Sequence, residues 1–376
     1  MFDPAIFPEI KGNLGFGCMR LPMNGEEVDL EEFAKMTDAY IGAGFNYFDT
    51  AHGYINGKSE TAIKKVVSER YPRESFLLTN KLSDSYFAKN EDIRPFFESQ
   101  LEYCGVDYFD FYLMHAQDSR NYPQYRRCKA YETALKFKEE GLIKHLGLSF
   151  HDKAEVLDGI LSDHPEVEVV QIQFNYADYE DPSVQSRKVY EVCAKHGKPV
   201  IVMEPVKGGS LVKLPDDADK IFRQLGGGSN ASYAMRFAGS FPGMRVVLSG
   251  MSNLEQMNDN IASMKDFKPL DEKELCALSQ VMEAFGKLNL IPCTACKYCI
   301  EQNECPMNIR IPDVFAALNA HNEFHNWNTA YYYNNVVTAN SGKASDCIGC
   351  GMCESVCPQH IEIRRFLEEA AAAFEK

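Results

Sequence analysis

Short apolar runs alternate with longer amphipathic segments along the first two thirds of the chain. Each apolar run is five or six residues long and often carries β-branched or aromatic side chains, as buried strands do. The predicted strands span residues 14–18, 45–49, 76–80, 109–114, 144–148, 169–173, 199–203 and 245–249. Helical spacing of apolar positions predicts helices at residues 29–41, 59–67, 93–103, 125–140, 154–161, 184–196, 229–238 and 253–264.

The repetition of this strand–helix unit predicts a closed (β/α)8 TIM barrel of class α/β. An open doubly wound sheet is the alternative, and it would need a Gly-x-Gly-x-x-Gly turn after its first strand. Gly15 and Gly17 supply the first two glycines, but Arg20 stands at the third position. We therefore expect a barrel with its functional side chains at the C-terminal ends of the strands.

The long connection between the seventh and eighth predicted strands carries Gly208-Gly209 and Gly226-Gly227-Gly228. Glycines let backbone N–H groups approach a phosphate closely, and a flexible surface loop is the equally good alternative.

The pattern changes after residue 265. One amphipathic helix is predicted from Asp271 to Leu288, and cysteine-rich sequence follows. We predict a barrel domain at residues 1–268 and a small α-helical domain at residues 269–376.

Bulk composition narrows the classes of partner. The chain has 376 residues, of which 45% are hydrophobic and 25% charged, and its formal net charge is −15. This charge argues against nucleic acid or an anionic membrane as a partner, because both attract a basic surface. We see no apolar run of spanning length and no charged-then-apolar leader, so we expect a cytoplasmic protein.

Ionisable side chains stand at the C-terminal ends of three successive predicted strands. Asp49 ends the second strand and Tyr54 follows it, Lys81 ends the third, and His115 ends the fourth. A tyrosine of pKa near ~10 is a weak acid unless its phenolate is stabilised. An ammonium lowers that pKa, and a carboxylate holds the ammonium in place. We predict that Tyr54 donates a proton, tuned by Lys81 and Asp49, and that His115 binds a substrate carbonyl oxygen.

Each of these residues taken singly has an ordinary structural explanation. A lysine at a strand end is usually a solvated edge charge, a tyrosine is usually a core or rim residue, and a lone histidine is more often structural. The three strand ends together favour a site that reduces a carbonyl, provided that a hydride donor binds beside it.

These residues resemble the aldo-keto reductase family. The family's Asp-x-x-x-x-Tyr motif is found at Asp49–Tyr54, its lysine at Lys81 and its histidine at His115, and the resemblance spans roughly residues 12–265. It implies a (β/α)8 barrel, NAD(P)H extended across the barrel mouth, and interconversion of a small-molecule carbonyl and alcohol. Hydride transfer would occur with Tyr54 as general acid/base.

The resemblance also implies residues that contact the nicotinamide. Ser149 and Gln171 match carboxamide-binding positions, although the asparagine usual after the serine is Phe150 here. Met203 and Glu204 replace the aromatic residue that commonly stacks on the ring, and a methionine can still pack there through its thioether.

The 2′-phosphate end of the implied cofactor site departs from the family pattern. Where NADPH-preferring members have a lysine and an arginine, this chain has Gly250 and Gln256, while Asn260 fits the asparagine that contacts adenine. Neither Gly250 nor Gln256 can neutralise a phosphate dianion. We predict no strong preference for NADPH over NADH.

The C-terminal third contains two blocks of four cysteines. They are Cys293-x2-Cys296-x2-Cys299-x5-Cys305-Pro306 and Cys347-x2-Cys350-x2-Cys353-x3-Cys357-Pro358. Zinc sites also use C-x2-C pairs, but a zinc site needs only two pairs, whereas each block here has three cysteines at this spacing and a Cys-Pro. We predict two [4Fe-4S] clusters. The other five cysteines are expected to be reduced thiols, mostly in the core: Cys18, Cys104, Cys128, Cys193 and Cys276.

The blocks resemble those of bacterial ferredoxins, in which the fourth ligand of each cluster comes from the other run. This implies one cluster on Cys293, Cys296, Cys299 and Cys357, and a second on Cys347, Cys350, Cys353 and Cys305. The loop before Cys305 is longer than the usual pattern. The whole chain is similar to the ferredoxin-type branch of the aldo-keto reductases, whose strings are found at Ser149–Asp152, Met203–Pro205 and Cys357–Gln359.

The role of the clusters stays open at this stage. They are either structural or exchange electrons with an electron-transfer protein as partner. A nicotinamide gives two electrons as hydride and a cluster takes one, so a flavin would be needed to divide the pair. The alternative function is an iron–sulfur electron-transfer protein whose barrel is a flavin- or nicotinamide-binding redox module. A further hypothesis is a redox-sensing binding protein with little turnover. The presence of Asp49, Tyr54, Lys81 and His115 together argues against it.

Candidate residues for lining the substrate pocket are Arg20, Tyr86, His151, Asn175 and Trp327. An anionic substrate would fit if Arg20 faces the mouth, and the alternative is that Arg20 pairs with a neighbouring acid.

Overall fold

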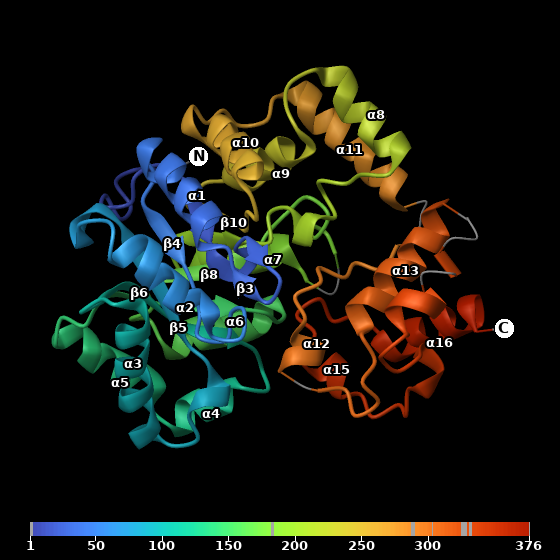
Figure 1. The fold of residues 1–376 in the computed structure, drawn as a ribbon. Helices are drawn as coiled ribbons and strands as arrows, with labels where there is room; N and C mark the ends of the chain where they lie inside the picture. Colours follow the sequence, from blue (N-terminus) through green and yellow to red (C-terminus); the bar gives the residue numbers. More distant parts are fainter. Residues whose placement is uncertain are drawn as a thin grey trace. The chain divides into compact units, whose positions relative to one another are not determined.

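The computed structural model describes residues 3–181, 184–286, 290–302, 304–324, 329–330 and 333–375. Its parallel strands form a closed barrel in the order β1-β10-β9-β8-β7-β6-β5-β4 (Figure 1). They are β1 (Leu14–Gly17), β4 (Tyr47–Asp49), β5 (Leu77–Leu82), β6 (Phe109–Gln117), β7 (Ile143–Phe150), β8 (Val169–Gln173), β9 (Val200–Met203) and β10 (Met244–Ser249). The predicted fold class, a (β/α)8 barrel followed by a helical C-terminal region, is confirmed.

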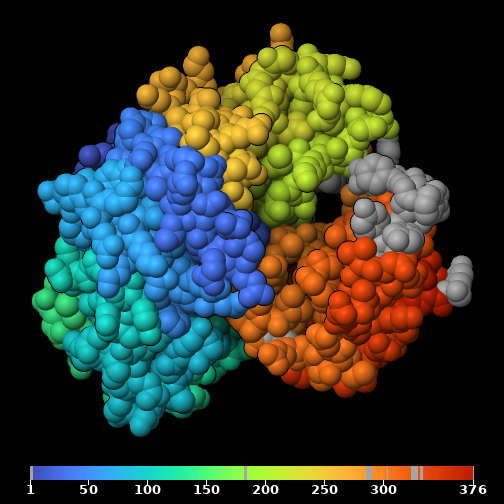
Figure 2. Space-filling model, viewed as in Figure 1, coloured from blue at the N-terminus to red at the C-terminus, as the bar shows by residue number. Residues whose placement is uncertain are grey.

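Helices alternate with these strands, as the apolar spacing predicts. They are α1 (Leu30–Gly42), α2 (Lys58–Ile63), α3 (Asn90–Cys104), α4 (Tyr122–Arg127), α5 (Ala130–Glu139), α6 (Ala154–Asp163), α7 (Ser186–Lys195), α9 (Asn230–Gly239) and α10 (Leu254–Lys265). Helix α2 continues as one π-helical segment, Lys64–Ser68. A short hairpin of β2 (Met23–Asn24) and β3 (Glu27–Val28) was not predicted. In the space-filling view, the blue to teal residues, which include α1, α2 and α3, form one continuous surface (Figure 2).

Side chains fill the interior of the barrel. One buried cluster comprises Ile10, Tyr47, Leu77, Phe111, Leu113, Val169, Ile201, Val246 and Leu248. Gly147 is required by this packing, because a Cβ there would lie 2.5 Å from Leu113 Cδ2 and 2.6 Å from Val169 Cγ1. The barrel is therefore a packed core, so small molecules can reach the strand ends only from the mouth.

The N-terminal segment closes the other end of the barrel. Arg245 at the start of β10 is buried, and its guanidinium donates to the backbone carbonyls of Ile6, Phe7, Ile10 and Gly12. No sequence pattern predicted this closure of the barrel by the N-terminal segment. The segment accepts the hydrogen bonds of Arg245 through backbone carbonyls, which every residue has.

A histidine between two carboxylates also holds the N-terminal segment in place. Glu9 bonds His145 Nε2 at 2.7 Å, and Glu168 bonds Nδ1 of the same ring at 3.0 Å. Glu168 also accepts from Lys138 Nζ at 2.6 Å and from the Leu146 amide at 2.9 Å.

By compactness the chain divides into two units. The first comprises Met1–Pro205 with Ala231–Leu270, and the second Val206–Asn230 with Asp271–Lys376. The division at Leu270 lies close to the predicted boundary, but residues 206–230, which that boundary assigns to the barrel, group with the C-terminal unit. The reason is α8 (Asp216–Leu225), which packs against α11 (Glu272–Gly286) and buries Ala218 and Phe222 (Figure 1).

The rest of the second unit is helical. Its elements include α12 (Tyr298–Glu301), α13 (Ile311–Phe324), α15 (Met352–Ser355) and α16 (Ile363–Phe374). Its core contains Cys299, Cys353 and Cys357 together with apolar side chains such as Val314 and Leu367. Within the described ranges, no helix combines the length and apolar character needed to cross a membrane.

Candidate functional site

The ends of β4 and β5 place a carboxylate and an ammonium side by side. Asp49 is the last residue of β4 and pairs in register with Thr79 of β5, two residues before Lys81. Both charged side chains are buried, at 3% exposure for Asp49 and 0% for Lys81. Burying two charges costs free energy unless they are paired and hydrogen-bonded, and the predicted neighbours provide that pairing.

The ammonium of Lys81 has three hydrogen-bond acceptors. Its Nζ lies 2.6 Å from Asp49 Oδ1, 2.8 Å from the Thr50 carbonyl oxygen and 3.1 Å from the Tyr54 hydroxyl oxygen. An ammonium has three protons, so these contacts use all of them. The Tyr54 oxygen is therefore an acceptor toward Lys81, and its own hydrogen can be donated elsewhere.

The direction of the Tyr54 pKa differs from the expectation that Lys81 lowers it. Burial raises the pKa of Tyr54 well above its usual value, and the carboxylates of Asp49 and Glu204 raise it further. Burial also lowers the pKa of Lys81, against the opposing effect of Asp49. Sequence reasoning counted the neighbouring cation and missed the loss of hydration. Tyr54 is thus a neutral phenol that holds its proton.

His115 in β6 lies beside Tyr54, with ring centroids 6.0 Å apart. Burial lowers the pKa of His115 well below its usual value, and the charges of Lys81 and His151 add to this effect. Its Nδ1 is 2.6 Å from Ser83 Oγ. If Ser83 donates to Nδ1, the neutral ring carries its hydrogen on Nε2 and can donate there. Ser83 was missed, and its place two residues after Lys81 was the available signal.

Ser149 and Gln171 follow in β7 and β8 and pair in register. Gln171 Nε2 donates to Asp49 Oδ2 at 2.9 Å, so this glutamine also fixes the carboxylate. Ser149 Oγ accepts from the Ala116 amide at 2.7 Å, which leaves its hydroxyl hydrogen to donate. A hydroxyl donor and an amide oxygen side by side are the groups that a carboxamide needs, so this pair fits a nicotinamide.

The end of β9 carries Met203 and Glu204. Met203 packs against the interior cluster of the barrel. Glu204 has a left-handed backbone, with φ of 56°, and its carbonyl accepts from Asn175 Nδ2 at 2.9 Å. Its carboxylate lies 3.6 Å from Arg20. The second of the two expectations for Arg20, pairing with a neighbouring acid, describes this arrangement, and Asn175 supports the backbone.

The residues beyond β10 lie around the start of α10. Gly250 and Gln256 are exposed, and Gln256 Oε1 accepts from the Ser252 amide at 2.8 Å. Asn260 is buried and donates to Ser249 Oγ at 2.6 Å. A Cβ on Gly250 would lie 3.3–3.4 Å from Arg20 side-chain carbons, so Arg20 covers this glycine.

The remaining candidate lining residues are placed unequally. Tyr86 is 39% exposed and meets the ring of His52 edge-on at 4.7 Å, while His52 Nδ1 bonds the buried Glu60 at 2.7 Å. His151 is half-buried and its amide donates to the Gln117 carbonyl. Trp327 lies outside the described residues.

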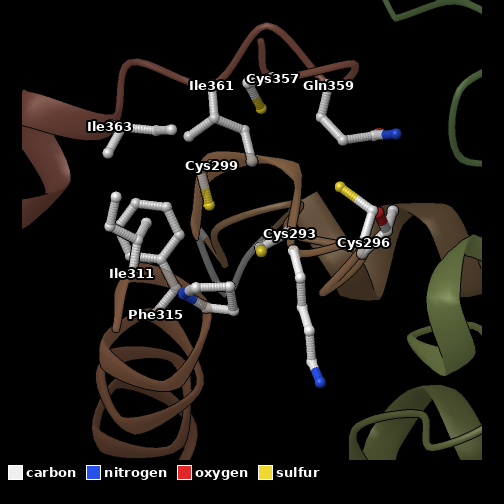
Figure 3. A pocket seen from close by; sticks show the side chains of 12 residues that line it. Cys293, Cys296, Cys299, Ile311, Phe315, Cys357, Gln359, Ile361 and Ile363 are labelled. Atoms are coloured by element: carbon white, nitrogen blue, oxygen red, sulfur yellow. The ribbon is translucent and has the colours of Figure 1, made fainter. Parts of the chain in front are cut away.

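Four cysteines of the second unit line one pocket. Cys293, Cys296, Cys299 and Cys357 lie around this pocket, and their sulfur atoms point into the same space, which Gln359 borders (Figure 3). The apolar part of the lining is Ile311, Phe315, Ile361 and Ile363. Burial raises the pKa of the Cys299 thiol, and the charges of the neighbouring cysteines add to this. Holding thiolates here therefore needs compensating cations, as iron supplies. These four cysteines are the set that the ferredoxin-like crossing implies.

The second set is more open. Cys350 is exposed, whereas Cys347 and Cys305 are half-buried. The pKa of Cys353 is raised to about 11, first by burial, then by the charge of Glu354 and then by the charges of Cys347 and Cys305. These three thiols are therefore neighbours. Among the residues with described positions, no three or more His, Cys, Asp or Glu side chains are placed so that they could bind one metal ion. A cube binds each thiolate through a different iron, which sets the sulfurs farther apart than the ligands of one ion.

The two cysteine runs repeat one backbone conformation. Ala295 and Lys297 in the first run have φ of 51° and 67°, and Gly349 and Gly351 at the matching places have φ of 71° and 74°. The same holds three residues after each final cysteine, at Asn308 (53°) and His360 (50°). Such left-handed residues are rare without a reason, and their repetition favours a duplicated cluster-binding loop.

The five remaining cysteines are free thiols. Cys18, Cys104, Cys128 and Cys193 are buried, and Cys276 is exposed.

Comparison with known proteins agrees with this architecture. Residues 13–283, well over half of the chain, match the model of the Aldo/keto reductase family. The protein therefore belongs to the aldo/keto reductase family. Residues 292–362 match the model of a 4Fe-4S dicluster domain.

Individual relatives are distant. A segment of 160 residues is 30% identical to human aldo-keto reductase family 1 member C3, covering 38% of this chain and 48% of that protein. A segment of 187 residues is 26% identical to the NADH-specific methylglyoxal reductase of Escherichia coli, covering 45% of this chain and 54% of that protein. The chain thus spans about half the length of these curated relatives.

Solved structures match over more of the chain. The aldo/keto reductase of Klebsiella pneumoniae in complex with NADP and acetate is 20% identical with a TM-score of 0.59, covering 72% of this chain and 91% of that one. At this identity the likeness shows the barrel fold alone.

Proposed function

We propose that the barrel is an NAD(P)H-dependent oxidoreductase that interconverts a small-molecule carbonyl and its alcohol, with Tyr54 as general acid/base. The observation that carries this proposal is the use of all three Lys81 protons by Asp49, Thr50 and Tyr54. Because the Tyr54 oxygen accepts from Lys81, its hydroxyl hydrogen is the one that can leave toward a substrate. Membership of the aldo/keto reductase family supports the same activity.

The proposed reaction needs one hydride and one proton. Reduced nicotinamide supplies the hydride, with its electron pair, to the carbonyl carbon. As the carbonyl π electrons move to oxygen, Tyr54 gives that oxygen its proton, and the resulting phenolate is stabilised by the ammonium of Lys81. Neutral His115 donates a hydrogen bond to the same oxygen and stabilises its developing charge. In the direction of oxidation, the phenolate takes the alcohol proton.

The proposed cofactor contacts come from the strand ends. Ser149 donates to the carboxamide oxygen, and Gln171 accepts from the carboxamide nitrogen while its own nitrogen holds Asp49. Met203 and Glu204 lie at the ring, and Asn260 at the adenine end. The Klebsiella pneumoniae neighbour was solved with NADP, which supports a nicotinamide cofactor at this fold.

Cofactor preference is proposed from the other end of the site. Gly250 and Gln256 bring no positive charge, and Arg20, which lies beside Gly250, is paired with Glu204 at 3.6 Å, so a 2′-phosphate gains little there. One relative, from Escherichia coli, is named as NADH-specific, which supports a site of this kind.

The second unit is proposed to hold two [4Fe-4S] clusters with crossed ligand sets. The first set is Cys293, Cys296, Cys299 and Cys357, and the second is Cys347, Cys350, Cys353 and Cys305. The pocket around the first set, the repeated left-handed positions and the dicluster-domain match support this proposal.

The alternative function makes the chain an iron–sulfur electron-transfer protein that uses its barrel as a flavin- or nicotinamide-binding module. The exposure of Cys350 favours it, because an exposed ligand lets a partner protein approach the cluster closely. The matter turns on whether a flavin is present, which mass analysis of the released cofactors would detect.

Replacement of one oxygen atom tests the main proposal. In Tyr54→Phe, turnover of an aldehyde panel with NADH and NADPH should fall by at least about a hundredfold. Iron content and visible absorbance should match wild type. Tyr103→Phe is the matched control, because Tyr103 is 43% exposed and is not among the hydrogen-bond partners of Lys81. Wild-type turnover in Tyr54→Phe would show that Tyr54 is not the general acid/base.

A further inference from the structure

Lys207 is a buried cation of the second unit that the proposed reaction does not use. It begins the short turn Lys207–Gly209 and is 6% exposed. Its Nζ donates to Gln359 Oε1 at 3.3 Å. Gln359 borders the pocket of the four cysteines and follows Cys357 by two residues (Figure 3). The amide thus connects the ammonium of Lys207 to the wall of that pocket.

The turn that carries Lys207 is packed against the other cysteine run as well. A Cβ on Gly208 would lie 2.3 Å from the carbonyl oxygen of Thr294 and 2.7 Å from its Cα. Thr294 lies between Cys293 and Cys296 and also lines the pocket. Only glycine permits this approach, and its φ of 63° is the left-handed value that glycine adopts readily. The turn is therefore fixed to both segments that supply the four cysteines.

Lys207 itself has φ of 48°, which is unusual for a residue with a side chain. A left-handed lysine costs roughly 1 kcal/mol relative to the ordinary backbone. This conformation places the long side chain of Lys207 in a buried position beside Gln359, at the cost of both strain and desolvation. Such costs are typical of a functional position.

We propose that Lys207 raises the reduction potential of the cluster held by Cys293, Cys296, Cys299 and Cys357. This inference rests on the proposed presence of two [4Fe-4S] clusters. A cube with four thiolates is an anion, and reduction by one electron adds a further negative charge. A fixed positive charge stabilises the reduced form more than the oxidised form, and burial keeps water from screening it.

The second unit contains two comparable cations that should act less. Lys297 lines the same pocket, but its side chain is 57% exposed. Arg364 lies near the second cysteine set, but its side chain is 50% exposed. Lys297 therefore has the charge and the location of Lys207 without its burial, which makes it the matched control.

The experiment is a redox titration of the full chain followed by electron paramagnetic resonance. Lys207→Gln removes the charge and keeps a donor for Gln359, while Lys207→Met removes both. In each variant we expect the equilibrium constant for reducing one of the two clusters to fall about tenfold, equivalent to about 59 mV for one electron. Lys207→Arg should return the potential toward wild type, and Lys297→Met should move it far less.

Iron and sulfide content separate the possible failures. Wild-type protein without iron would end the two-cluster proposal, and with it this inference. Full iron content with a wild-type potential in Lys207→Gln would overturn the inference alone, as would an equal shift in Lys297→Met. Loss of iron in both neutral variants would also overturn it, because Lys207 would then hold the loop and not set the potential.

Discussion

Lys81 donates its three protons to three different oxygens, and this determines which proton the site can release. The residue types at the strand ends were predictable from the sequence, because parallel strands bring their C-terminal ends to one rim. The direction of the Tyr54 pKa was not predictable, because it depends on how completely the phenol is buried. Ser83 and Thr50 were also missed. Thr50 contributes through a backbone carbonyl, which has no sequence signature, whereas the place of Ser83 two residues after Lys81 was an available signal.

Ser83 offers a test of the orientation of His115. In Ser83→Ala the imidazole loses its 2.6 Å partner and can adopt the wrong tautomer or tilt. We expect kcat/KM to fall by up to about a hundredfold, with the affinity for NADH, measured by fluorescence titration, unchanged. Ser85→Ala in the same loop is the control. Equal losses in the two variants would mean that the loop, and not the hydrogen bond, matters.

The low pKa of His115 predicts a pH profile. Because burial lowers this pKa well below its usual value, the ring stays neutral as the pH falls through about 6.5, where an exposed histidine would gain a proton. We therefore expect kcat/KM for carbonyl reduction to stay level from about pH 8 to about pH 6. A loss of activity centred near pH 6.5 in wild type, absent from His115→Asn, would contradict this assignment.

Glu168 predicts how acid affects stability. Partial burial acts to raise its pKa, but hydrogen bonds from His145, Lys138 and the Leu146 amide outweigh this and lower the pKa to about 2. A carboxyl whose pKa is lower in the folded state stabilises the fold above its unfolded value near 4.5, and that stability is lost as the pH falls toward 2. We expect Glu168→Gln to cost up to about 3 kcal/mol at pH 7.

Urea unfolding at pH 7 and pH 4 checks this expectation. The difference between wild type and Glu168→Gln should be about 1 kcal/mol smaller at pH 4, because part of the wild-type advantage has already gone. Glu166→Gln, which removes a half-buried carboxylate beside His164, is the control. If the stability difference between wild type and Glu168→Gln is larger at pH 4 than at pH 7, the pKa of Glu168 is not lowered in the folded state.

At the scale of elements, strands and helices of the barrel were predictable because each buries one face and shows the matching period. Helix α8 was not predicted. Its apolar residues Ala218, Ile221, Phe222 and Leu225 follow helical spacing, but the segment lies between two glycine runs and is rich in aspartate, so it was interpreted as a loop. What holds it is α11, nearly fifty residues further along the chain. The contact with α11 covers the apolar side of this helix.

The repeated left-handed positions of the cysteine runs give a prediction for one loop. Gly349 has φ of 71° and no protein atom within 4 Å of a Cβ built on it, so Gly349→Ala tests backbone strain without a clash against the chain. We expect it to lower stability by about 1 kcal/mol. Ala295→Gly at the matching place of the first run should raise stability by a similar amount, reduced by the greater freedom of glycine in the unfolded chain. Thermal loss of the visible absorbance would measure both, and two changes of the same sign would rule out the strain.

The start of α10 gives a prediction for cofactor choice. Gln256 is exposed in the first turn of this helix, where the N-terminal dipole already favours an anion. In Gln256→Arg, affinity for NADPH should rise by about tenfold while affinity for NADH is unchanged, since only the former carries the 2′-phosphate. Glu255→Gln, which raises the net charge by the same one unit at the neighbouring residue, is the control. A similar gain in both variants would point to general attraction.

At the scale of the whole molecule, the division of the chain does not follow its order. Residues 206–230 leave the barrel sequence and belong to the second unit. The change in composition predicts a boundary near residue 268, and the compact units divide at Leu270. The grouping of residues 206–230 with the second unit was not predictable, because glycine-rich sequence is compatible with a ligand loop, a surface loop or a packed turn. The packed turn is distinguished by Gly208, where a Cβ would lie 2.3 Å from the Thr294 carbonyl oxygen.

A truncation tests this division. Removal of residues 271–376 should expose Phe222 and Ala218, because α11 no longer covers α8, and the shortened chain should aggregate. If residues 207–229 are also replaced by a short Gly/Ser linker, the barrel should stay monomeric in sedimentation experiments and bind NADH. A truncated chain that is monomeric with residues 207–229 in place would contradict the assignment of α8 to the second unit.

The crossing of the two proposed ligand sets has a consequence for how oxygen inactivates the protein. Each cube would draw its fourth thiolate from a segment some fifty residues away, so the two cofactors jointly fasten the same pair of loops. Damage to either cluster would free a cysteine loop that also supplies ligands to the other cluster. Inactivation in air should then proceed as one collapse of the C-terminal unit, with iron from both sites lost together, and not as two separate bleaching steps.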